Sequence, residues 1–151
     1  VVANLREVKK WEQPIISDHS SSLNGFLVSK INNTMHYLLK IIIEPGFDKS
    51  KYTSTIFEKN FSLNSRKNIK FLSFFNKKNC SMDIINSDEG GGFLKNQTRN
   101  MICEIKDHNK INLYDNFIWA SHNQVVELIN QNKMTIEARN LFASCNVDKI
   151  K

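Results

Sequence analysis

The chain has 151 residues, of which 40% are hydrophobic and ten are phenylalanine, and this composition suits a single domain over residues 1–151. Its formal charge of +6 comes mostly from lysines scattered among Asn and Ile, without a nucleic-acid-reading motif, so we expect no nucleic-acid partner. The longest apolar run, Leu38–Ile43, contains Lys40 and is far shorter than the roughly 20 residues of a membrane span, so we expect no membrane partner.

The first part of the chain is predicted to form a short helix and a β-hairpin. Residues 4–11 place apolar side chains near one face of a helix, which Pro14 ends. Residues 25–31 and 35–43 have strand character and are separated by an Asn-rich turn. A Pro-Gly step ends the second strand, and the β-branched residues within 52–61 predict a further strand.

The remainder is predicted to contain a helix, several short strands and two closing helices. Residues 66–76 carry Ile, Leu and Phe at helical spacing, which predicts a helix packed on the sheet with its aromatic side chains in the core. Strand character follows over 82–85, 93–94, 100–106 and 111–119. Ser121 and Gln124 match a capping box for a helix to Asn130, and Thr135 is the predicted N-cap of a second helix. This order, without alternating βαβ units, predicts an α+β fold.

Four short blocks of sequence, spread over residues 11 to about 145, carry a family resemblance. They are WEQPII at 11–16; GFLV at 25–28 with HYLL at 36–39 and EPG at 44–46; SDEGGGF at 87–93 with RNM at 99–101 and Glu104; and Trp119, Gln124 and Leu128 with MTIEARNL at 134–141. In this order they resemble the NDP-hexose 2,3-dehydratases. The resemblance implies a Nudix-like mixed sheet flanked by helices, usually present as two tandem repeats. Since this chain carries one repeat, we expect a homodimer.

The same resemblance implies an activity on a nucleoside-diphosphate sugar in deoxysugar biosynthesis. Such an enzyme removes water across C2 and C3 of an NDP-4-keto-6-deoxyhexose, with no redox cofactor. The 4-keto group acidifies the C3 proton and the C2 hydroxyl departs, which requires a base, an acid and a stabilised enolate. The stacked glutamates of the Nudix hydrolases are absent, so pyrophosphate hydrolysis does not follow from the fold.

One run departs from the family pattern and leaves a second function open. Where family members typically have a Ser-Pro-Thr-Val-Gln-like run, residues 53–57 read Thr-Ser-Thr-Ile-Phe. Ser54 replaces the proline, and Phe57 replaces a glutamine that could face the sugar. The alternative is therefore a non-catalytic repeat that binds a nucleotide sugar, or a partner subunit of a two-repeat enzyme.

Three residues are candidates for the catalytic acid and base. Glu44 ends a buried-looking strand before Pro-Gly and is the candidate base, with turn capping or a lysine partner as the alternative. His36 begins the same strand and is a candidate acid or sugar contact, although a strand histidine also simply packs. Glu89 precedes a glycine triplet and is the third candidate, with a solvated hairpin carboxylate as the alternative.

Seven residues are candidates to bind the substrate: Trp11, Gly90, Gly91, Arg99, Asn100, Trp119 and Arg139. The glycine amides can approach a diphosphate, and the Arg99 guanidinium can bind phosphate oxygens bidentately with Asn100 as a neighbouring donor. The two tryptophans offer faces to a nucleobase, with core packing as the alternative for Trp119. For Arg139 we expect instead an ion pair on a helix surface.

The cysteines and histidines give no metal or disulfide pattern. Cys80, Cys103 and Cys145 are odd in number and widely spaced, which favours reduced thiols and a cytoplasmic protein. The four histidines have no metal-ligand spacing, so we expect no structural metal and no cofactor. We also expect no signal peptide, because no basic segment followed by an apolar one opens the sequence.

Overall fold

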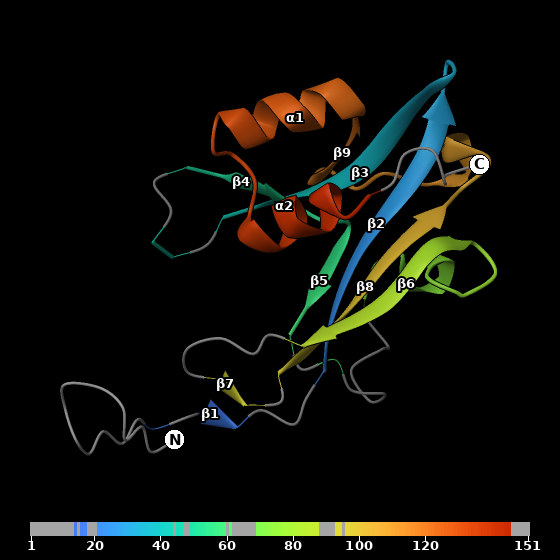
Figure 1. The fold of residues 1–151 in the computed structure, drawn as a ribbon. Coiled ribbons are helices and arrows are strands. Elements are labelled where there is room, and N and C mark those ends of the chain that lie inside the picture. The colour runs from blue at the N-terminus through green and yellow to red at the C-terminus, as the bar shows by residue number, and fades with distance from the viewer. Residues whose placement is uncertain are drawn as a thin grey trace.

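The computed structural model describes residues 14, 16–17, 21–43, 45–46, 49–59, 61, 69–87, 93–94 and 96–145. Within them a mixed sheet of seven strands has the order β4-β3-β2-β8-β6, with β5 pairing to β2 and β9 pairing to β3. The strands are β2 (Ser21–Ile31), β3 (Thr34–Ile42), β4 (Lys51–Thr53), β5 (Ile56–Glu58), β6 (Cys80–Ser87), β8 (Gln97–Glu104) and β9 (Phe117–Ser121). A separate parallel pair joins β1 (Ile16–Ser17) and β7 (Phe93–Leu94), and the helices are α1 (His122–Asn130) and α2 (Ile136–Ala143) (Figure 1).

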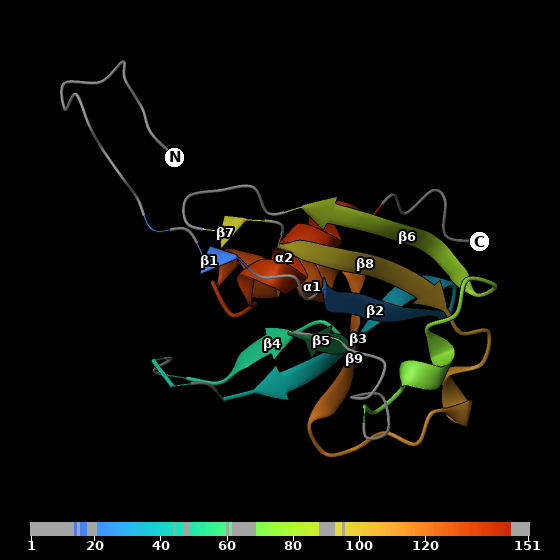
Figure 2. The same cartoon turned by 90° about the horizontal axis from the view of Figure 1, so that it is seen from below.

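β2 is the central strand, and the predicted hairpin with β3 is confirmed. Asn32 and Asn33 have φ of 49° and 60°, the left-handed conformation that a two-residue hairpin turn requires and that Asn tolerates. On its other side β2 runs parallel to β8 from Ser21 to Val28, and β6 pairs with β8 in turn. Figure 2 shows these three strands lying side by side.

Alternating side chains give the sheet a core on each face. On one face α1 and α2 cover β2, β3, β8 and β9, with Phe26, Tyr37 and Leu141 fully or almost fully buried. On the other face a second core that includes Leu27 and Leu38 is packed by the aromatic segment 69–75. The α+β layout predicted from the sequence is confirmed.

The two C-terminal helices begin where their capping residues predict. Ser121 accepts from the Gln124 amide while the Gln124 side chain accepts from the Ser121 amide, which completes the capping box of α1. Thr135 accepts from the Ala138 amide at the start of α2. In the part of the chain that the structure describes, no helix is long and apolar enough to cross a membrane.

The sheet splits where β3 diverges from β2, and the Thr55 hydroxyl bridges the split. The Leu27 amide donates to Thr55 Oγ1 at 2.8 Å, and that hydroxyl donates to the Leu38 carbonyl at 2.5 Å. β4 continues the pairing of β3 while β5 pairs with β2. The prediction of one strand over 52–61 is therefore wrong, because Ser54 and Thr55 leave the strand to fill the split.

Two further element predictions are wrong. The helix predicted over 66–76 is only a 3-10 turn at Leu72–Phe74 within residues 69–76, because Phe71 has φ of 65° and stops a right-handed helix. Its aromatic rings do pack on the core as predicted, with the Phe71 and Phe117 rings 4.9 Å apart. The strand predicted over 111–119 begins only at Phe117. The helix predicted over 4–11 lies outside the described residues.

The cysteine chemistry also differs from the prediction. Cys80 and Cys103 form a disulfide between β6 and β8, so the expectation of three reduced thiols is wrong. The two residues are opposite each other in the strand register, a proximity that 23 residues of sequence separation conceal. Cys145 is the free cysteine of the described part, and burial raises the pKa of its thiol to about 12.

Candidate functional site

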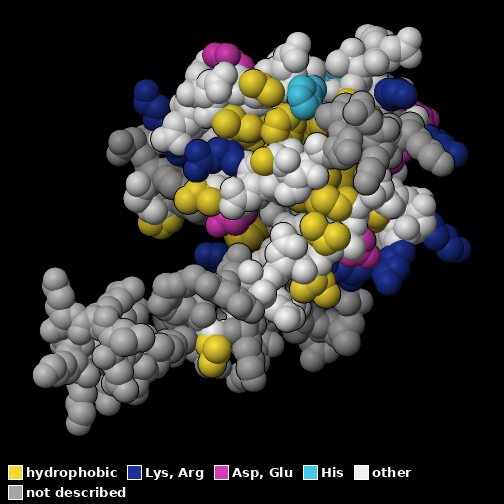
Figure 3. Space-filling model, viewed as in Figure 1, with side chains coloured by type: hydrophobic (Ala, Val, Ile, Leu, Met, Phe, Trp, Pro, Cys, Tyr) yellow, Lys and Arg dark blue, Asp and Glu magenta, His cyan; other side chains and the backbone are white. Residues whose placement is uncertain are grey.

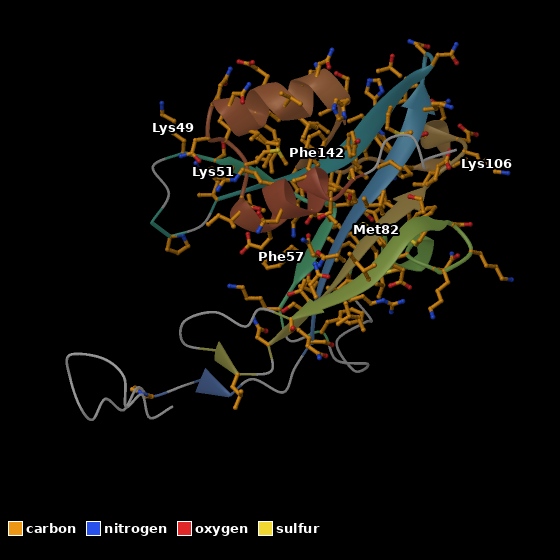
Figure 4. The ribbon with its side chains drawn as sticks, in the orientation of Figure 1. Lys49, Lys51, Phe57, Met82, Lys106 and Phe142 are labelled. Carbon is orange, nitrogen blue, oxygen red and sulfur yellow. A yellow bond between two sulfur atoms is a disulfide. The ribbon has the colours of Figure 1, made fainter. Side chains whose placement is uncertain are left out.

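A cleft of about 450 Å³ lies where the end of β3, β4 and β5 meet the start of α2. Its lining residues are Lys40, Ile42, Lys51, Thr53, Phe57, Lys59, Asn132, Met134, Thr135, Ile136, Glu137 and Arg139. Figure 4 labels Phe57 at β5 beside α2 and Lys51 at β4. Figure 3 shows basic side chains among hydrophobic ones on the face that carries α2 and β4.

The cleft is rich in positive charge. Lysines 40, 51 and 59 and Arg139 line it, against one carboxylate, that of Glu137. Within the described residues, neither Lys40 nor Arg139 has an ion-pair partner. α2 begins at the cleft, so the positive end of its helix dipole adds to the field of these side chains. The arrangement therefore favours an anionic ligand.

Hydrogen bonds fix the wall that β4 and the start of α2 form. The Tyr52 amide donates to the Lys133 carbonyl at 2.8 Å, and the Thr135 amide donates to the Tyr52 carbonyl at 3.0 Å. One hydrogen bond of 3.1 Å joins the hydroxyl groups of Thr53 and Thr135, and both side chains are buried. The side chains on this wall are thus presented by a rigid backbone.

A buried amide, Asn24, joins this wall to the middle of the sheet. Its Nδ2 donates to Asn100 Oδ1 at 3.1 Å and to the backbone carbonyl of Glu137 at 3.0 Å. Its Oδ1 accepts from the Ser54 hydroxyl at 2.6 Å. Asn24 is 2% exposed, and these bonds anchor the first turn of α2, which carries Glu137 and Arg139.

Two of the predicted substrate-binding residues are connected with the cleft. Arg139 lines it, whereas Asn100 accepts a hydrogen bond from Asn24, the buried amide that anchors the start of α2. The Arg99 side chain lies on the face of β8 opposite to Asn100, because successive side chains of a strand point to opposite faces. Its Nε and Nη2 donate to the two carboxylate oxygens of Asp83, each at 2.7 Å. These bonds lower the pKa of Asp83 below its ordinary value. The structure therefore separates Arg99 from Asn100, its expected neighbour in binding.

His36 and Trp119 do not line the cleft. His36 Nδ1 is 2.9 Å from the Thr34 carbonyl at the hairpin end of β3. At roughly 3.3 Å per residue, His36 lies about 13 Å along the strand from Lys40. Trp119 of β9 packs against the core on the face away from the helices, with its ring edge-on to His108. Five further candidates lie outside the described residues: Trp11, Glu44, Glu89, Gly90 and Gly91.

The sequence did contain signals for the cleft residues that it did not identify as binding groups. Lys40 interrupts an apolar strand, where a charged side chain requires a solvent-facing or functional position. Phe57 stands in the run that departs from the family pattern, and it lines the cleft. What the sequence alone lacks is the split of the sheet, which brings β4 and β5 to the start of α2.

Comparisons with known proteins give a family match. A model of the NDP-hexose 2,3-dehydratase family matches residues 1–145. The dTDP-4-dehydro-6-deoxy-alpha-D-glucopyranose 2,3-dehydratases of Amycolatopsis orientalis and Saccharopolyspora spinosa are each 24% identical to the chain, covering 83% and 96% of it. The chain spans only 28% and 31% of the length of these two relatives.

Solved structures give weaker similarities of shape. The C. elegans Ap4A hydrolase has a TM-score of 0.47 and 9% identity, over 82% of this chain and 96% of that one. The NUDIX domain of Shewanella oneidensis NrtR, complexed with ADP ribose, has a TM-score of 0.47 and 8% identity, over 88% of this chain and 86% of that one.

Proposed function

Since the chain belongs to the NDP-hexose 2,3-dehydratase family, we propose that it binds an NDP-4-keto-6-deoxyhexose in the cationic cleft and removes water across C2 and C3. The observation that supports this site is the gathering of three lysines and Arg139 around one cleft at the start of α2. A diphosphate carries closely spaced negative charges, and an Arg fork with neighbouring ammonium groups is the donor set that binds phosphate oxygens. Both relatives named above are dTDP-sugar 2,3-dehydratases, which favours a thymidine nucleotide as the ligand.

The proposed reaction needs a proton acceptor, a proton donor and donors near the carbonyl oxygen. A base removes the C3 proton, the electrons pass to the 4-keto oxygen, and the enolate expels the C2 hydroxyl, which leaves as water with a proton from the acid. In the described lining the available carboxylate is Glu137, and cations such as Lys40 can stabilise the enolate oxygen. Glu44 stays a candidate base, two positions after Ile42, which lines the cleft.

A non-catalytic nucleotide-sugar-binding repeat is the second candidate function. Two observations favour it: the described lining offers one carboxylate and no histidine, and Phe57 occupies a position where the family resemblance implies glutamine. Both functions use the same binding cleft and differ only in turnover.

Two measurements on the 151-residue chain test the proposal. Calorimetric titration with thymidine diphosphate measures binding, and mass spectrometry of the matching 4-keto-6-deoxy sugar nucleotide detects loss of one water. Arg139→Gln is expected to weaken binding about 10- to 150-fold, because a charge-assisted hydrogen bond contributes about 1.5–3 kcal/mol. Lys30→Met is the matched control, since Lys30 is exposed near the hairpin and does not line the cleft.

The outcomes separate the two functions. Binding with a product lighter by one water supports the dehydratase, whereas binding without turnover supports the non-catalytic repeat. Lack of nucleotide binding, or equal effects of Arg139→Gln and Lys30→Met, contradicts the proposed site.

Assembly and location are part of the same proposal. We propose that two copies of the chain pair, which would give the two-repeat arrangement that the resemblance implies; light scattering of the purified chain measures this. The cytoplasmic location expected from the sequence is also a proposal. The Cys80–Cys103 disulfide weighs against it, because disulfides are rare in reducing compartments.

A further inference from the structure

Phe57 is an aromatic side chain placed among cations. It belongs to β5, lines the cleft and is only partly buried. Its neighbours in the strand, by contrast, alternate away from it: Ile56 is 2% exposed and belongs to the core on the opposite face. The ring of Phe57 is less enclosed than that of Phe26, which is fully buried in the core between the sheet and the helices. Part of the Phe57 ring is therefore exposed to the cleft, where a bound ligand can contact it.

The backbone of Phe57 is held firmly. Phe57 pairs with Asn24 of β2 in the antiparallel register, and Asn24 pairs with Asn100 of β8. Asn24 is the amide that anchors the first turn of α2. The Ser54 Oγ also lies 2.9 Å from the carbonyl oxygen of Ile56, so Asn24 and the residue before Phe57 share the single hydroxyl proton of Ser54. Asn24 therefore holds both the strand that carries Phe57 and the helix turn that carries Arg139.

A cation lies close to the ring. Lys59 Nζ is 6.0 Å from the Phe57 ring centroid, and both residues line the cleft. An aromatic face beside an ammonium group offers one molecule a stacking surface and a phosphate ligand together. A nucleotide has this pattern, because one pentose separates its base from its first phosphate. Inorganic diphosphate has the phosphate groups but no base to stack on the ring.

Resting on the proposed function, we infer that Phe57 determines specificity in the cleft by stacking the nucleobase of the bound nucleoside diphosphate. The lysines and Arg139 hold the diphosphate. Phe57 is then a binding residue that this chain has in place of the glutamine implied by the family resemblance. It selects for a nucleotide over a simple diphosphate, without selecting strongly among bases, since every base has a π face.

Calorimetric titrations of four proteins with two probes test this inference. The proteins are the wild type, Phe57→Leu, Phe57→Trp and Phe57→Gln, and the probes are thymidine diphosphate and inorganic diphosphate. Phe57→Leu keeps an apolar side chain and removes the ring, so thymidine diphosphate should bind about 5- to 150-fold more weakly. Phe57→Trp should retain binding, and Phe57→Gln should weaken it as Leu does. Inorganic diphosphate should bind equally to all four.

The results distinguish this inference from the proposed function. If Phe57→Leu leaves thymidine diphosphate affinity unchanged, or weakens both probes equally, the stacking role is overturned while nucleotide binding stands. If the wild type binds neither probe, the proposed function fails and the inference fails with it. The Trp variant also reports on folding, because its retained affinity shows that a substitution at this position leaves the cleft intact.

Discussion

Thr55→Val tests whether one hydroxyl holds the split sheet together. The substitution preserves side-chain volume and branching but leaves the Leu27 amide and the Leu38 carbonyl without the hydroxyl that they share. An unpaired buried polar group costs about 1–3 kcal/mol, so two groups cost about 2–6 kcal/mol. A loss of 3 kcal/mol lowers the midpoint of thermal unfolding by about 6–12 °C in a domain of this size.

Thr55→Ser is the matched control for this prediction. Serine keeps the hydroxyl and loses one methyl group, which costs about 1 kcal/mol. Chemical denaturation with unchanged m-values gives the free energies of unfolding of the wild type and both variants. We expect the Val variant to be clearly less stable than the Ser variant. Equal stability of the two, or a more stable Val variant, would refute the bridging role of the hydroxyl.

Three further predictions concern stability. Because its ion pair lowers the pKa of Asp83, that carboxylate stabilises the fold above its unfolded pKa of about 3.9, and this contribution is lost as the pH falls through the lower folded value. Asp83→Asn should therefore flatten the acid limb of a plot of unfolding free energy against pH, and an unchanged limb would contradict this. Cys80→Ser should lower the free energy of unfolding by about 2–4 kcal/mol, and thiol labelling of the unfolded, unreduced wild type should modify Cys145 but neither Cys80 nor Cys103. Gly25→Ala should cost about 1–3 kcal/mol by denaturant titration, because a Cβ there would lie 2.2 Å from the Phe75 ring; a neutral effect would mean that the ring moves aside freely.

The elements that the sequence predicted well are those with local signals. The capping box at Ser121, the N-cap at Thr135 and the Asn-Asn hairpin turn each satisfy backbone groups within a few residues, and all three are present. The α+β layout follows from the order of such elements.

The wrong predictions concern features that depend on contacts between residues far apart in the sequence. Residues 69–75 have helical spacing, but the Phe75 ring packs against Gly25 and the Phe71 ring packs against Phe117. The positive φ of Phe71 turns the chain there and prevents a continuous helix. The disulfide depends on strand register, which cysteine spacing does not reveal.

The candidate site was only partly predictable for the same reason. Arg139 was a candidate phosphate ligand for which an ion pair on the helix surface was expected, and within the described residues it has no such pair and lines the cleft. Lys40 of β3 and Lys59, which follows β5, both reach this cleft where the sheet splits. Arg99 was singled out for its chemistry, and in the structure its guanidinium is bonded to Asp83. Residue type identifies what a side chain is able to bind, but register decides which side chains share a cleft.

The most direct test of the cationic cleft is to map thymidine diphosphate binding on the isotopically labelled chain by two-dimensional amide NMR. The account predicts that saturable shifts gather at Lys51–Lys59 and at Met134–Arg139. Saturable shifts centred instead on Arg99 and Asp83, or on the hairpin around His36, would contradict it, as would the absence of any saturable shift.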